Sequence, residues 1–396
     1  MPITQTADEL FPELARYQRQ LLAGGGIGLL ISLVELLFNP TQFYQSYLMA
    51  YMFCLSITLG CLALGMVHQL TGGAWGIVIR RPIGAASRLL PLMTLLFVPV
   101  IVGMNNLYPW THAAVVARSE LLQAKHAYLN VPFFLLRAVI YFATWNAISY
   151  WLNKWAAEQD RTADPEVARK MQKVSAAGLV LYGLTITFAS FDWLMSLEPD
   201  WYSTIYGVLV MGGQGLSALA FLIGVLVWLS RRPPLDRIIV KAHFHDLGNL
   251  LLAFVMLWAY FGFSQYLIIW AGNLPQEISW YVHRLQTGWR FIGITLILFH
   301  FALPFVLLLS RTTKREADLI VKVAIGILFV RLVDLFWLIA PEFHTGGFAV
   351  SWLDIVLPAS LGAVWLGCFI SQLRRRTILP VHDPEFEEAL GHVALT

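Results

Sequence analysis

The stretch FDWLMSLEPDWYSTIYG, from Phe191 to Gly207, lies between two long apolar segments and carries three carboxylates among its aromatic residues. An acid such as Asp192 near hydrocarbon depth is costly unless it is paired, so its position calls for a reason. A weaker copy, DLFWLIAPEFH, follows 142 residues later, from Asp334 to His344. Both copies contain an Asp, six residues, then a Pro, an acid and an aromatic residue, which indicates an internal repeat.

The composition around this stretch is that of an integral membrane protein. Of 396 residues, 58% are hydrophobic and 13% are charged, whereas soluble domains have about 25% charged residues. Ten apolar runs approach the length needed to cross about 30 Å of hydrocarbon. We therefore predict an all-α fold with transmembrane helices roughly at 21–38, 45–69, 88–107, 132–153, 174–195, 204–230, 247–270, 287–310, 319–340 and 350–373.

The basic residues predict the orientation of these ten segments. Of the 27 Lys and Arg residues, 21 fall at the connections on one side, and only Arg118, Lys125 and Arg284 fall on the other. Because loops rich in Lys and Arg stay in the cytoplasm, we expect both termini there: a segment 1–20 and a tail 374–396. The first 20 residues contain acids and no signal-peptide core, so we expect them to be retained. The Asp192 stretch then faces outward.

Several classes of ligand are not expected from the sequence. The formal charge of +3 reflects the cytoplasmic loops, and no basic tract with interleaved aromatic residues suggests nucleic-acid binding. The three cysteines lie within apolar segments and form no CxxC motif, which disfavours zinc and iron–sulfur ligation. His112 and His126 have a spacing seen on haem-bearing helices, but charged residues separate them. A third candidate, the run from His243 to Asp246, looks only faintly like a metal site, so we expect no directly bound metal or haem.

Two further matches extend the repeat. Segments three and seven both end in Asn-Leu followed closely by Pro, at 106–109 and 273–275. Segments four and eight both begin with an Arg a short way in, Arg137 and Arg290. Each match joins segments four apart, an even offset, so the two halves would have the same orientation. We expect two four-helix bundles within 21–373, segments two to five (about 45–195) and six to nine (about 204–340), flanked by segments one and ten.

The ionisable residues within the membrane fall into two groups. In the first bundle, Arg137 and Asp192 are expected to approach the outer face from neighbouring segments. In the second, Arg290 and Asp334 are expected to do the same, and Arg331 lies one helical turn before Asp334. The candidates for a quinone pocket or a proton path are Asp192, Arg137, Glu198, Asp200, Trp193, Arg290, His300, Arg331, Asp334 and Glu35.

Two interpretations of these residues remain open. An apolar, aromatic-lined cleft with an acid and a His or Arg suits a quinone head group, since the acid can accept the proton released on quinol oxidation. Buried acids and His are also the usual relay stations of proton paths. Alternatively, the Arg–Asp pairs only neutralise each other and join helices, while Trp and Tyr anchor the chain at the membrane interfaces.

Three stretches resemble a known family: FDWLMSLEPDWYSTIYG, HDLGNLLLAFVMLWAYFGFSQYLIIWAGNLPQEISWYVHR (His245–Arg284) and the terminal PVHDPEFEEAL. They resemble the F subunit of bacterial alternative complex III (ActF), a relative of the NrfD and polysulfide-reductase type of membrane subunit. The resemblance covers nearly the whole chain. It implies a ten-helix fold with two four-helix bundles, in a quinol:cytochrome c or other quinol:electron-acceptor oxidoreductase of the bacterial inner membrane.

The resemblance also implies partners and cofactors. The complex contains a related membrane C subunit, an iron–sulfur subunit and multihaem cytochrome c subunits, so haem c and the clusters belong to partners. Quinol oxidation is assigned mainly to the C subunit, so whether menaquinone or another quinone binds this chain stays open. We favour a complex subunit with a quinone pocket or proton path and no redox centre of its own. The alternatives are a purely structural anchor and an independent secondary transporter, which the few midplane helix interruptions disfavour.

Overall fold

A computed structural model describes residues 6–162, 164–286, 288–344, 346–380 and 386. Within these residues it contains ten helical segments long and apolar enough to cross a membrane, and no β-strand. The prediction of an all-α, multi-span membrane protein is therefore confirmed. The helices run beyond the predicted apolar stretches, because their polar ends continue past the hydrocarbon. For example, the segment predicted at 132–153 is a helix from Val131 to Thr162.

Seven of the spans are single helices and one is joined to a short turn. The single spans are α2 (Glu13–Phe38), α3 (Pro40–Thr71), α11 (Val131–Thr162), α13 (Tyr206–Ser230), α14 (Lys241–Gly272), α19 (Ala317–Phe343) and α20 (Leu353–Arg374). The fifth span, α12 (Pro165–Trp193), continues into η3 (Met195–Leu197). Short helices connect or precede the spans: α1 (Ala7–Leu10), α4 (Ala74–Ile77), α8 (Met104–Leu107), η2 (Pro109–Thr111), α9 (Ala113–Val116), α10 (Glu120–Lys125), η4 (Leu235–Arg237), α15 (Pro275–Gln286) and α18 (Arg311–Arg315).

The third and eighth spans are interrupted. The third consists of α5 (Arg80–Ser87), α6 (Leu90–Leu95) and α7 (Val98–Val102), and Pro91 and Pro99 stand at the starts of α6 and α7. Proline has no N–H to continue the preceding helix, so each one begins a new helical piece. The eighth runs from α16 (Arg290–Thr295) through a π-helical turn, η5 (Leu296–Ala302), into α17 (Leu303–Leu309).

Two long helices form the axis of the molecule. Helix α3 packs against α12, α13, α19 and α20, and α13 packs against α3, α12, α14 and α19. In the apolar 18-residue stretch of each helix, 78% of α3 and 72% of α13 is buried. The same stretch is 11% buried in α2 and 17% buried in α14, so α2 and α14 present most of their surface to lipid. Because α12 and α19 each contact both axial helices, the packing is reciprocal, as a repeat would require. The bundle boundaries themselves stay a prediction.

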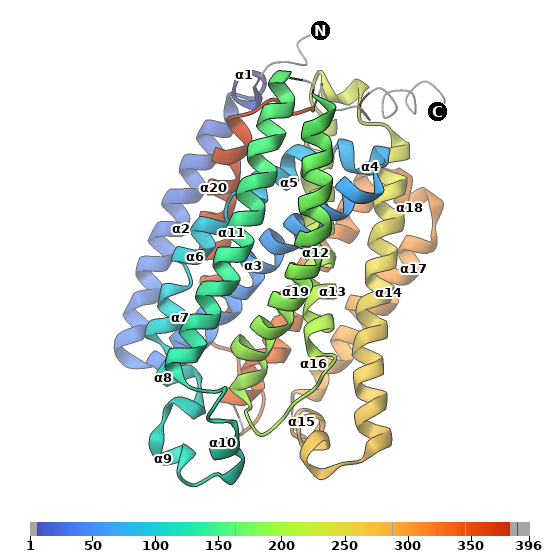
Figure 1. The fold of residues 1–396 in the computed structure, drawn as a ribbon. Helices are drawn as coiled ribbons and strands as arrows, with labels where there is room; N and C mark the ends of the chain where they lie inside the picture. Colours follow the sequence, from blue (N-terminus) through green and yellow to red (C-terminus); the bar gives the residue numbers. More distant parts are fainter. Residues whose placement is uncertain (1–5, 163, 287, 345, 381–385, 387–396) are drawn as a thin grey trace.

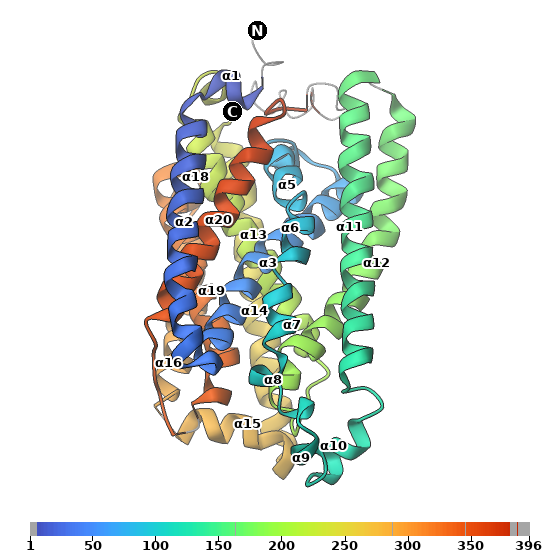
Figure 2. The ribbon, with the colours of Figure 1, turned by 90° about the vertical axis from the view of Figure 1, so that its left-hand side faces the viewer.

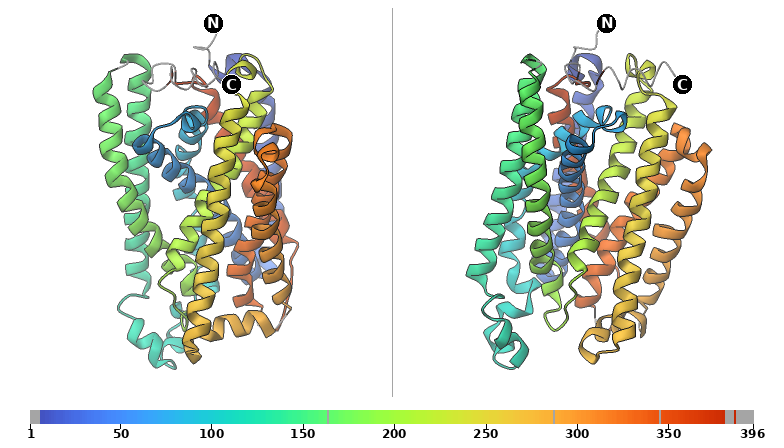
Figure 3. Two further views of the ribbon diagram at one scale, coloured as in Figure 1. Left: turned by 90° about the vertical axis from the view of Figure 1, so that its right-hand side faces the viewer. Right: turned by 45° about the vertical axis from the view of Figure 1, so that its right-hand side comes forward.

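The outer helices are arranged in pairs around this axis. Helix α2 lies beside α20, and α11 beside α12 on the opposite flank, with α5 and α6 between the two pairs (Figure 2). Helix α14 packs against α17 and α18 and forms the remaining side (Figure 3). Helix α1 and the C-terminal end of α20 lie at one end of the molecule, which we call the terminal end (Figure 1). The opposite, distal end carries α9, α10 and α15 (Figure 1).

Candidate functional site

The first polar cluster joins α11 to the last turn of α12 near the distal end. Arg137 binds Asp192 with two hydrogen bonds of 2.8 Å, from Nε to Oδ2 and from Nη2 to Oδ1. The Tyr141 hydroxyl donates a third bond, also 2.8 Å, to Oδ2. Asp192 has no exposed surface and Arg137 is 6% exposed. The predicted approach of these two residues is therefore a bidentate, buried ion pair, the strong geometry for such a contact.

The remaining atoms of this pair are also engaged. Arg137 Nη1 donates to the Tyr128 carbonyl at 2.9 Å, and its guanidinium lies 3.8 Å from the centre of the Tyr128 ring. Trp193, the neighbour of Asp192, is fully buried and packs against Phe97 and other aromatic rings. Neither carboxylate oxygen lacks a donor. This cluster, the closed pair, is built to hold α11 and α12 together.

The second polar cluster belongs to α19 and faces α13 and α14. Arg331 and Asp334, one turn apart on the helix, form an ion pair and are 3% and 4% exposed. Trp258 of α14 donates its indole N–H to Asp334 Oδ2 at 3.3 Å. Arg331 Nε donates to the Ser217 hydroxyl of α13 at 3.3 Å. Asp334 is therefore held by its own helix and by a neutral donor, and no second helix contributes a cation in the described residues.

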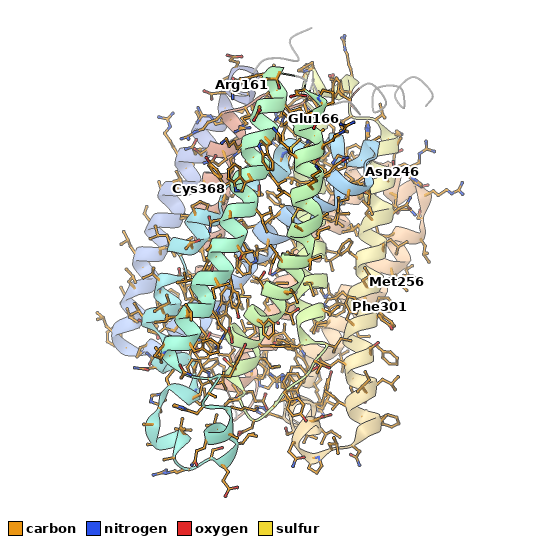
Figure 4. All side chains as sticks on the ribbon, viewed as in Figure 1. Arg161, Glu166, Asp246, Met256, Phe301 and Cys368 are labelled. Atoms are coloured by element: carbon orange, nitrogen blue, oxygen red, sulfur yellow. The ribbon has the colours of Figure 1, made fainter. Side chains whose placement is uncertain are left out.

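An unpaired histidine adjoins this second cluster. His300 lies in the π-helical turn of the eighth span, is fully buried, and neither ring nitrogen has a hydrogen-bond partner. Its ring centre is 4.0 Å from that of Trp258, so the indole lies between the histidine and Asp334. Phe301, the next residue, marks the level of this turn near the middle of the bundle (Figure 4). Buried polar atoms without partners are uncommon, and π-turns are frequent at functional sites.

A third cluster lies at the distal end, where the two halves meet. Arg284 of α15 is 1% exposed, and its Nη1 lies 3.4 Å from Glu198 Oε2. Its guanidinium also stacks on the Trp280 ring at 3.7 Å. Glu342, at the end of α19, lies close enough to Glu198 and Arg284 to interact with their charges. Burial lowers the pKa of Arg284 from its ordinary value, and the charges of Glu198 and Glu342 oppose that shift.

Arg284 is the cation that both acids share, because the charges of Glu198 and Glu342 both act on it. Tyr206, buried in α13, interacts electrostatically with Arg284, Asp334 and Glu198. It therefore stands between the second cluster and the distal cluster.

The other predicted residues lie apart from these clusters. Arg290 begins α16 and is exposed, and its guanidinium lies 5.0 Å from the centre of the Phe291 ring. The partner of Asp334 is thus Arg331 and not Arg290, because the rotation of α16 turns Arg290 outward. Glu35 is half-buried on α2, and Asp200 is exposed in the turn after η3. Of the ten candidates, the structure places seven in the three clusters and leaves these three outside.

Sequence reasoning missed five residues of these clusters, listed here by helix: Tyr141 (α11), Tyr206 (α13), Trp258 (α14), Arg284 (α15) and Glu342 (α19). A signal existed for Glu342, because the repeat aligns it with Asp200 after the shared Pro. Arg284 was counted as a residue of an outer connection. Its helix α15 is short, and nothing local to it shows that α19 and the Glu198 turn cover its guanidinium.

Neither known proteins nor a metal site identifies a function for this chain. Compared with known proteins, the chain matches no family model and no protein of curated function. Among the described residues, no three His, Cys, Asp or Glu side chains gather around a point that could hold one metal ion. The three polar clusters and the sequence motifs are therefore the features that indicate a function.

Proposed function

We propose that the chain is a membrane subunit of a quinol:cytochrome c, or quinol:electron-acceptor, oxidoreductase, and that its second bundle conducts protons. The subunit carries no redox centre. Its partners are a related membrane subunit, an iron–sulfur subunit and multihaem cytochrome c subunits in a bacterial inner membrane, with both termini cytoplasmic. Support comes from the resemblance in the Asp192 stretch and in His245–Arg284, from the ten spans, and from the one-sided basic residues.

The observation that carries the proton path is the state of His300. A fully buried imidazole with two free ring nitrogens can accept a proton on one and release it from the other. The His300 ring contacts the ring of Trp258, and the Trp258 indole N–H donates a hydrogen bond to Asp334. Buried acids and histidines of this kind are typical of proton relays in membrane proteins.

The path continues from Asp334 toward the distal end. Tyr206 lies within the electrostatic reach of Asp334 and of the Glu198–Arg284 pair. Glu198 and Glu342 lie within electrostatic reach of each other, and Asp200 is exposed two residues beyond Glu198. A proton leaving the Asp334 cluster thus meets a hydroxyl, then two carboxyl groups, then a solvent-exposed acid. Bridging water between polar groups of this kind costs little free energy.

The closed pair supports a different role for the first bundle. Both oxygens of Asp192 are already bound by Arg137 and Tyr141, so neither is available to a quinol hydroxyl. Neither of the hollows described for this chain is lined by Asp192. A quinone site beside Asp192 is therefore the less supported reading, and we assign the pair to anchoring α11 on α12.

The test uses the intact purified complex. His300→Gln removes the titratable ring and should abolish the protons released per electron beyond the one that quinol oxidation itself yields. His126→Gln, an exposed residue of the distal loops, is the matched control and should leave the value unchanged. Unchanged proton release and turnover in an assembled His300→Gln complex would falsify the path. A stable chain without redox partners that moves a solute would instead support the transporter.

A further inference from the structure

Two arginines converge on one asparagine at the terminal end. Arg88, the residue that caps the end of α5, donates from Nη1 to Asn153 Oδ1 at 3.0 Å, and Arg376, just after α20, donates from Nη1 to the Asn153 carbonyl at 3.4 Å. Arg88 also binds the Gln372 side chain and carbonyl, at 3.2 and 3.3 Å. Arg81, about two helical turns before Arg88, lies close enough to Arg88 and Arg376 to interact with their charges. We call Arg81, Arg88 and Arg376 the basic cluster.

The basic cluster carries more positive than negative charge. In the described part of the chain, Arg88 and Arg376 donate to neutral acceptors, and Arg81 alone binds a carboxylate, Asp160. Within those residues, three guanidinium groups therefore face one carboxylate. Burial and the charge of Arg81 lower the pKa of Arg376 from its ordinary value, while Asp160 opposes that shift. Half-buried cations in such excess favour an anion beside them.

One donor of the cluster has no acceptor. Arg81 is 7% exposed, and its Nε has no hydrogen-bond partner, although its Nη2 binds Asp160 and the Leu379 carbonyl. A buried guanidinium N–H is rarely left unsatisfied. This free donor, in a region of excess positive charge, points to an acceptor oxygen with negative charge.

The cluster lies at the level of lipid head groups. Helix α11 has 32 residues, about 48 Å, so its ends project beyond about 30 Å of hydrocarbon. Next to Asn153, Lys154 Nζ lies 5.0 Å from the Trp151 ring centre, and Trp151 stacks on Trp155. Exposed Trp and Lys side chains of this kind mark the membrane interface. In Figure 2, α5 lies between α20 and α11, the helices that bring these residues together.

We propose that the basic cluster binds the phosphate of an anionic phospholipid in the leaflet at the terminal end. Guanidinium groups bind phosphate oxygens through two parallel N–H donors. Basic pockets between transmembrane helices on the cytoplasmic side are known to take anionic head groups, and the charge bias predicts that side here. Depth at the interface favours a lipid over a soluble anion. This site is independent of the proton path.

The test measures retained lipid on the purified full chain by native mass spectrometry. Phosphatidylglycerol and phosphatidylcholine are supplied separately in micelles. The wild type should retain phosphatidylglycerol and not phosphatidylcholine, and Arg88→Gln with Arg376→Gln should lower that retention roughly tenfold or more. The matched control, Arg16→Gln with Arg19→Gln, removes two exposed charges from the same end and should change retention by less than about twofold.

Several outcomes overturn the site. Equal retention by the two double variants, or equal retention of the two lipids, shows that no specific head-group site exists. Displacement of the lipid by inorganic phosphate at millimolar concentration shows a small-anion site. If the wild type retains no lipid until Asp383, Glu385, Glu387 and Glu388 are neutralised, the chain's own tail, outside the described residues, is the anion.

If a variant fails to fold, thermal unfolding of the wild type still tests the site. Phosphatidylglycerol should raise the thermal unfolding midpoint of the wild type, and phosphatidylcholine should not, because only a ligand of the folded state stabilises it. Equal shifts with both lipids count against the site. Arg88→Lys with Arg376→Lys keeps the charge but loses the planar fork, and should retain an intermediate amount of lipid.

Discussion

The closed pair and the Asp334 cluster occupy matching places in the two halves of the molecule, yet they differ in chemical capacity. Asp192 receives its cation from a neighbouring helix in bidentate geometry, and a tyrosine hydroxyl completes its shell. Asp334 receives its cation from its own helix and a weaker bond from an indole. One repeated motif thus gives a joint between helices in the first half and, beside the free His300, a site for proton exchange in the second.

The largest effect should come from breaking the closed pair. Arg137→Gln leaves Asp192 buried without a cation and should lower the free energy of unfolding by about 3–5 kcal/mol. Thermal unfolding of the purified chain in detergent measures this. The double variant Arg137→Gln with Asp192→Asn should recover part of the loss, since it leaves no buried charge. A loss below about 1 kcal/mol would show that the pair is not a joint.

The second test separates the two aspartates by function. Asp334→Asn should abolish the protons released per electron beyond the one that quinol oxidation itself yields in the assembled complex, because it removes the acid next to His300. Asp192→Asn should leave that ratio unchanged in whatever complex assembles, because its carboxylate serves structure. A pH-sensitive dye measures the proton release of both variants during quinol oxidation. If Asp192→Asn lowers the ratio and Asp334→Asn does not, Asp192 is the proton-transferring acid and Asp334 the structural one.

A smaller effect should follow from removing the third donor to Asp192. Tyr141→Phe deletes one hydrogen bond to a charged acceptor, with an expected loss of about 1.5–3 kcal/mol in unfolding free energy. Trp258→Phe removes the longer bond of 3.3 Å to Asp334 and should cost less. Thermal unfolding of the two variants side by side measures the difference. A greater loss for Trp258→Phe would mean that Asp334 is the more tightly held acid.

The smallest effect concerns the space around Arg331. A Cβ on Gly213 would lie 2.4 Å from Arg331 Nη2, so Gly213→Ala must displace the guanidinium, at a cost of about 1–3 kcal/mol. Gly224→Ala, in the same helix α13 with nothing within 4 Å, is the matched control and should be neutral or slightly stabilising. Unfolding midpoints measure both. Equal midpoints would show that Arg331 has room to move.

Much of the fold could be predicted because it follows from length and apolarity alone. The ten spans could be predicted in this way. The Arg137–Asp192 contact could be predicted as well, because a buried acid needs a cation and consecutive antiparallel helices bring one near. The orientation of Arg290 could not be predicted, because it depends on how α16 is rotated against α19. The Glu198–Arg284–Glu342 cluster joins a turn, a short helix and the end of another span, residues far apart in the chain. Only the tertiary packing brings them together.

The close packing of α2 against α20 has a consequence for biogenesis. The first span finds its largest partner only in the last one, and the Ala7 amide, which donates to the Arg376 carbonyl at 3.1 Å, joins the two ends. Until α20 leaves the insertion machinery, α2 lacks this partner and is left with contacts such as its smaller packing against α3 and the Glu13–Arg232 ion pair. A nascent chain that stops before Leu353 therefore exposes an unsupported first helix, which membrane quality control can recognise as unfinished.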